Sequence, residues 1–80
     1  MEIAIALREA RLAAGLEQRQ LAQMMNLSAS FVSDLEKGRR PFHDRYVDKL
    51  PGELQPRVRQ ALIAQHEAQI RFLMKESDSE

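Results

Sequence analysis

The residues best suited to bind a ligand lie in one short stretch, from Ser30 to Pro41, which reads SFVSDLEKGRRP. Its first half carries serines and a carboxylate where an exposed helix ordinarily carries long charged side chains. Its second half is a basic turn that contains Lys37, Arg39 and Arg40. Cations clustered in this way can bind phosphates and release counterions. The chemistry indicated is therefore recognition of a polyanion.

Residues that could support catalysis are sparse. The two histidines, His43 and His66, have no acid or serine at a distinctive spacing. No glycine-rich loop follows a strand pattern, and no carboxylate cluster resembles a metal site. A helical chain of 80 residues also offers little room for a pocket that excludes water. We therefore expect no enzyme activity, no metal and no cofactor.

The composition is that of a small globular domain, with 44% hydrophobic and 30% charged residues. No apolar run approaches the roughly 18 residues that a membrane span requires, so we expect no membrane contact. The absence of cysteine and of an export leader predicts a cytoplasmic location. Twelve basic residues balance twelve acidic ones. A core this small is marginal by itself, which makes a partner chain plausible.

Apolar residues at helical spacing predict an all-α fold. A first helix begins near Ile3, and Gly15 is placed to close it in a left-handed conformation. A short second helix begins at about Gln18 and ends before Asn26, since Asn tolerates positive φ better than other non-glycine residues.

The remaining breaks predict a third helix, a short fourth and a long last one. Ser28 is a good N-cap for the third helix, which should end at Gly38. Residues 44–50 make about two turns, and Pro56 is suited to the first turn of a helix that could reach Lys75. No segment alternates as a strand would.

Residues 18–36 form a short helix, a tight turn and a second short helix. Ala22 stands where two crossing helices would approach most closely, and larger apolar side chains can fill the angle between them. These side chains are Leu21, Leu27, Val32 and Leu35. This is the helix-turn-helix pattern, in which the second helix can be offered to the major groove of DNA.

Residues 11–40, reading RLAAGLEQRQLAQMMNLSASFVSDLEKGRR, resemble the Xre/Cro family of helix-turn-helix regulators, which includes the lambdoid phage repressors. The matching pieces are GLEQRQLA and NLSASFVSDLEKGRR, and several fixed spacings agree. The resemblance implies a five-helix lambda-repressor-like domain with an extended C-terminal helix. Residues 1–54 would bind DNA, with the recognition helix at about 28–37. Residues 55–75 would form a dimerisation helix, followed by an acidic tail at 76–80.

The resemblance also assigns roles to residues. Those expected at base edges are Ala29, Ser30, Ser33 and Asp34. Those expected at the DNA backbone are Gln18, Ser28, Phe31, Lys37, Arg39 and Arg40. Arg11 and Glu36 would form a structural ion pair between the first and third helices. Phe31 lies well off the inward side, so either it wedges against the DNA backbone or a methyl group, or it covers the loop before Asp44.

The last helix carries apolar residues on two sides. Val58, Ala61, Leu62, Phe72 and Leu73 fall in one arc, which would close the monomer. A second stripe, with Ile63, Ile70 and Met74, needs a second copy of the helix to cover it. The expected dimer interface comprises Ile63, His66, Ile70, Leu73 and Met74. The alternative is that the domain folds the helix back and covers both stripes itself.

The function expected from the resemblance is that of a sequence-specific transcriptional regulator. It would bind a palindromic operator as a homodimer and act as a repressor or autoregulator. The alternative is an antitoxin-like or adaptor module whose last helix holds a protein partner. The balanced charge and Glu17, where the family usually has Ser or Thr, favour this alternative slightly.

Overall fold

The computed structural model describes residues 2–78, with side chains as far as residue 74. Its elements in chain order are α1 (Ile3–Ala13), α2 (Gln18–Met25), α3 (Ala29–Glu36), the 3-10 helices η1 (Asp44–Lys49) and η2 (Gly52–Leu54), and α4 (Gln55–Asp78). No strand occurs in these residues. The predicted all-α fold with an extended C-terminal helix is confirmed. Its short fourth helix is η1, and η2 is a single turn that leads into α4.

A left-handed residue follows the end of each of the first three helices, within two residues of it. These residues are Gly15 (φ 72°), Asn26 (φ 58°) and Gly38 (φ 73°). In each case the next N–H donates to a carbonyl five residues back: Leu16 to Arg11 at 3.1 Å, Leu27 to Ala22 at 2.8 Å, and Arg39 to Asp34 at 2.9 Å. This bond satisfies a carbonyl that the helix end would leave unpaired, and it turns the chain sharply. The predictions that Gly15, Asn26 and Gly38 would end these helices are confirmed.

The core lies where α1, α2, α3 and the start of α4 meet. Its largest fully buried side chains are Leu7, Leu21, Met25, Val32, Leu35, Leu54 and Val58. Ala22 is also buried, as expected for a small residue where α2 and α3 pack together. Because Val58 and Ala61 belong to this core, the first two turns of α4 complete the same body as the helix-turn-helix.

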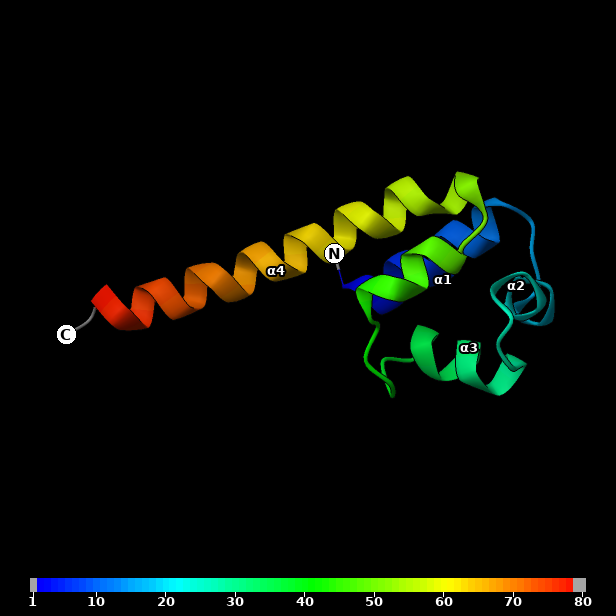
Figure 1. Cartoon of the computed structure of the whole chain (residues 1–80), viewed down its shortest axis with the longest axis horizontal. Helices are drawn as coiled ribbons and strands as arrows, with labels where there is room; N and C mark the ends of the chain where they lie inside the picture. Colours follow the sequence, from blue (N-terminus) through cyan, green and yellow to red (C-terminus); the bar gives the residue numbers. More distant parts are fainter. Residues whose placement is uncertain (1, 79–80) are drawn as a thin grey trace.

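The second half of α4 projects away from this body. In Figure 1 α4 runs alongside α1 and then continues alone as a single rod, which gives the molecule extents of 49 × 22 × 18 Å. Every residue from Ile63 to Met74 is exposed. Phe72 and Leu73, which were expected to close the monomer, are each 63% exposed. That expectation is wrong, and so is the alternative in which the domain folds the helix back. Within residues 2–78, no other helix packs against this part of α4.

None of the described helices combines the length and the apolar character that crossing a bilayer demands.

Candidate nucleic-acid interface

The orientation of α3 is set by its N-terminal cap and by its inward side. The Ser28 hydroxyl accepts a hydrogen bond from the Phe31 N–H at 3.1 Å, which confirms the predicted N-cap. Val32 and Leu35 are buried, at 0% and 2% exposure. Because these residues point into the core, the residues between them must face outward.

The outward side of α3 forms one wall of a shallow hollow of about 330 Å³. The residues that line it are Gln18, Ala29, Ser30, Ser33 and Asp34. The structure therefore brings together all four residues expected at base edges and adds Gln18 from α2. Ala29 and Ser30 are exposed, and Ser33 and Asp34 are half-buried. Since these side chains are short, an incoming group could approach the helix axis closely, and it would meet hydroxyls, an amide and one carboxylate.

The Gln18 side chain is hydrogen-bonded to α3. Its amide nitrogen donates to Oε1 of Glu36 at 3.1 Å. A carboxamide carries two N–H donors and a carbonyl oxygen, so this bond leaves one donor and the acceptor for a ligand. The N-terminal end of α2 beside it is held by Gln20, whose side-chain oxygen accepts from the Glu17 N–H at 2.8 Å.

Glu36 is the centre of a buried network that joins α1, α2 and α3. Arg11 donates from Nε to Oε2 at 2.7 Å and from Nη2 to Oε1 at 3.1 Å. Its Nη1 also donates to the Leu16 carbonyl at 2.8 Å. The two side chains are 9% and 2% exposed. This carboxylate is therefore paired within the protein, so its charge is compensated before any phosphate approaches.

Cations cluster just beyond the end of α3. Lys37, Arg39 and Arg40 are all exposed. Among the side chains that the structure describes, none of the three forms an ion pair with a carboxylate. Their charges are therefore available to an anion that lies beside α3.

Phe31 packs against the protein's own aromatic residues. Its ring meets Tyr46 of η1 edge to face, with centroids 5.7 Å apart at 86°. Phe42 packs on the same tyrosine at 5.5 Å. Phe31 thus covers part of η1, whereas its contact with the DNA backbone stays a prediction. Tyr46 was not among the residues expected at the site, although an aromatic residue off the inward side of α3 signals that a partner is needed.

The residues expected at a dimer interface lie on the projecting part of α4. Ile63, Ile70, Leu73 and Met74 are between 51% and 63% exposed. Nε2 of His66 lies 3.6 Å from Oδ1 of Asp44, so this side chain leans toward η1. The distance between these atoms exceeds that of a good hydrogen bond.

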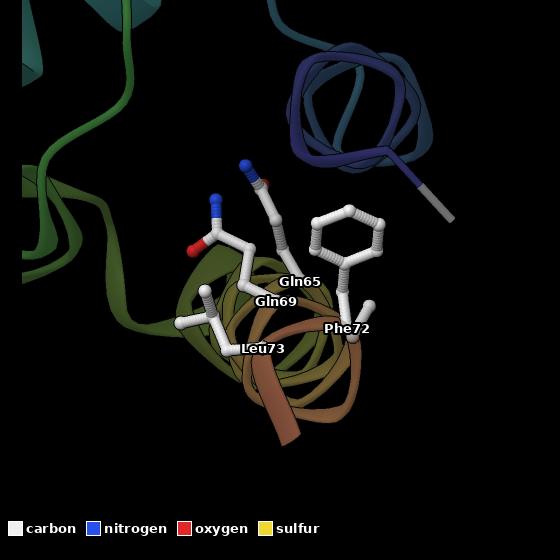
Figure 2. Close-up of a pocket in the computed structure, with 5 residues that line it drawn as sticks. Gln65, Gln69, Phe72 and Leu73 are labelled. Atoms are coloured by element: carbon white, nitrogen blue, oxygen red, sulfur yellow. The ribbon is translucent and has the colours of Figure 1, made fainter. Parts of the chain in front are cut away.

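A second hollow, of about 490 Å³, lies along α4. It is lined by Gln65, Ala68, Gln69, Phe72 and Leu73. In Figure 2 the labelled side chains leave the helix on the same side. At helical spacing this side continues the arc of Val58, Ala61 and Leu62, which the body covers at the start of α4. The core-facing stripe thus runs on beyond the core.

The chain is similar to known helix-turn-helix proteins. A family model described as a helix-turn-helix domain matches residues 2–50. A crystal structure of the clp gene regulator ClgR from Corynebacterium glutamicum aligns with a TM-score of 0.66 at 25% identity, covering 96% of this chain and 82% of that one. Another ClgR structure aligns with a TM-score of 0.65 at 27% identity, covering 82% and 86%. The search of curated proteins returned no match. With more than half of its residues matched by the family model, the chain belongs to the helix-turn-helix domain family.

Proposed function

We propose that this chain is a sequence-specific, DNA-binding transcriptional regulator of the Xre/Cro type. The observation that carries the proposal is the hollow of Gln18, Ala29, Ser30, Ser33 and Asp34, with exposed cations directly beyond it. A recognition helix lies in the major groove with its N-terminal residues at base edges. Short side chains on α3 allow that depth of approach. The likeness to a gene regulator supports the same assignment.

The base contacts that we propose follow from donor and acceptor chemistry. Asp34 carries the acceptor oxygens that suit the N4 amino group of cytosine. Ala29 can pack on a thymine methyl group, and Ser30 and Ser33 can donate or accept. These four side chains share one face of α3, so they would read adjacent positions.

The backbone contacts that we propose surround this face. Ser28 uses its oxygen as a cap acceptor, which leaves its hydroxyl hydrogen for a phosphate. Gln18 keeps one amide hydrogen for the same purpose. Lys37, Arg39 and Arg40 add charge contacts that do not depend on sequence and that weaken with salt.

The regulator would act as a homodimer on a palindromic operator and repress by blocking polymerase. The exposed apolar residues of α4 support pairing with a second copy, because a monomer leaves them in water. Half-sites would then lie about one helical turn apart, as the two-fold axis requires.

The proposal is tested by selecting duplexes from a random DNA pool with the purified chain. We expect an enriched palindrome that binds less tightly when salt is raised from 50 to about 200 mM. Arg39→Ala should weaken binding to selected and unrelated duplexes alike, whereas Ser33→Ala should weaken only the selected one. No enrichment over the input pool would refute the assignment.

A second candidate is an adaptor or antitoxin-like module that holds a protein through α4. The hollow along α4 and the balanced total charge support it. The DNA selection, together with a protein-binding measurement on the same purified chain, distinguishes the two candidates. A chain that enriches no duplex but binds a protein, and loses it on Phe72→Glu, is an adaptor.

A further inference from the structure

Arg40 is held against the recognition helix by an aromatic ring. Its Cζ lies 4.4 Å from the centroid of the Phe31 ring. Phe31 belongs to α3, and its ring rests in turn on Tyr46, which is 7% exposed. The three side chains thus lie in series, from the buried ring of Tyr46 through the Phe31 ring to the exposed guanidinium of Arg40.

An arginine that contacts an aromatic ring keeps more of its N–H donors available than an arginine in an ion pair. A guanidinium has five N–H donors, all in its plane. A carboxylate partner would occupy some of these donors and neutralise the charge. An aromatic ring instead contacts the flat face, attracts the cation and leaves the in-plane donors unused. Arg40 has the second kind of partner, and the structure gives it no carboxylate among the described side chains.

The neighbouring cations are arranged differently. Among the described side chains, neither Lys37 nor Arg39 lies over an aromatic ring. Arg45 lies near Tyr46, but its Cζ is 5.6 Å from the ring centroid. Within the basic turn after α3, Arg40 is thus the cation that, among the described side chains, contacts an aromatic ring of that helix.

We propose that Phe31 is a positioning residue that presents Arg40 to a DNA phosphate. This inference rests on the proposed function and assigns Phe31 a role different from direct contact. Because the ring and the base-facing residues sit on the same short helix, the phosphate contact of Arg40 would have a defined offset from the bases that α3 reads. Arg40 would therefore help to set the register of the protein on its operator, besides adding charge.

The test is a double-mutant cycle in DNA binding, measured by fluorescence anisotropy on the selected duplex. Phe31→Leu keeps apolar cover over Tyr46 but removes the ring. We expect it to weaken binding about two- to fivefold, the range of an exposed cation–π contact. Arg40→Ala should weaken binding more, and Phe31→Leu combined with Arg40→Ala should bind no worse than Arg40→Ala alone. The matched control is Arg39→Ala, whose effect should multiply with that of Phe31→Leu.

Two further measurements separate positioning from a general loss of structure. Arg40→Ala should lower the slope of log affinity against log salt by about one contact, whereas Phe31→Leu should leave that slope unchanged, because the charge remains. Phe31→Tyr keeps a ring and should retain affinity. In the free protein, the Arg40 side-chain protons should show an upfield ring-current shift in nuclear magnetic resonance spectra that Phe31→Leu abolishes.

The outcomes are distinct. If the wild-type chain binds no duplex, the proposed function fails and this inference fails with it. If the wild type binds, but Phe31→Leu is neutral or its effect multiplies with that of Arg40→Ala, the positioning role is overturned and the proposed function stands. The same holds if the ring-current shift is absent.

Discussion

Removing Glu36 should destabilise the chain more than any surface substitution. This carboxylate accepts from Nε and Nη2 of Arg11 and from the amide of Gln18, at distances of 2.7–3.1 Å. The Glu36 side chain is 2% exposed, so the carboxylate is hydrogen-bonded by these protein donors and not by bulk water. Glu36→Ala would leave the Arg11 guanidinium, itself 9% exposed, without its counterion inside the protein.

The expected cost can be bounded. Breaking a buried ion pair by removing one partner costs about 3–5 kcal/mol. A domain of 80 residues has a free energy of unfolding of about 4–12 kcal/mol. Glu36→Ala should therefore remove a large part of the free energy of unfolding. Replacing both partners, as in Arg11→Met with Glu36→Leu, removes the stranded charge and should recover most of the loss.

Urea unfolding followed by circular dichroism measures this cycle. We expect the midpoint to fall steeply for Glu36→Ala, to fall less for Glu36→Gln, which retains an acceptor, and to return toward the wild-type value for the double replacement. Glu9→Gln, at an exposed position of α1, serves as a control and should stay within about 0.5 kcal/mol of wild type. If the double replacement is as unstable as the sum of its single changes, the network is not an interdependent unit and the reasoning is refuted.

Three further predictions concern the other parts of the molecule. Gly38→Ala should lower the free energy of unfolding in urea by about 1 kcal/mol, because Gly38 has a φ of 73° that an alanine adopts only with strain. Gly52→Ala is the control and should be neutral, because both positions have open space for a Cβ but only Gly38 has a positive φ; equal effects would contradict this. The double variant Ile70→Lys, Met74→Lys should be a folded monomer in sedimentation velocity, because both residues are exposed on α4. Val58→Ala alters the buried core and should lower the free energy of unfolding without changing the oligomeric state; a wild-type monomer would contradict the prediction. Asp34→Ala should relax base preference at one operator position by about 1–3 kcal/mol, and Lys37→Ala should instead weaken all duplexes equally, as repeated selections would show.

Much of the fold was predictable because its determinants are local. A glycine or asparagine in a left-handed conformation and a serine cap act through the few residues beside them, so Gly15, Asn26 and Ser28 mark helix ends in the sequence itself. The inward side of α3 follows from the spacing of Val32 and Leu35. The candidate site could be listed from the resemblance, since its residues lie close together in the chain.

The tertiary structure alone decided how distant residues meet. It brought Gln18 within 3.1 Å of Glu36, packed Phe31 against Tyr46, and placed the Arg40 guanidinium over the Phe31 ring. It also decided that α4 is exposed at every position from Ile63 to Met74. The periodicity of a helix states which residues share a side, whereas the length of helix that is covered depends on where the other helices end. Helical spacing could therefore assign Phe72 and Leu73 to the core-facing side of α4 but could not show that the core stops before it reaches them.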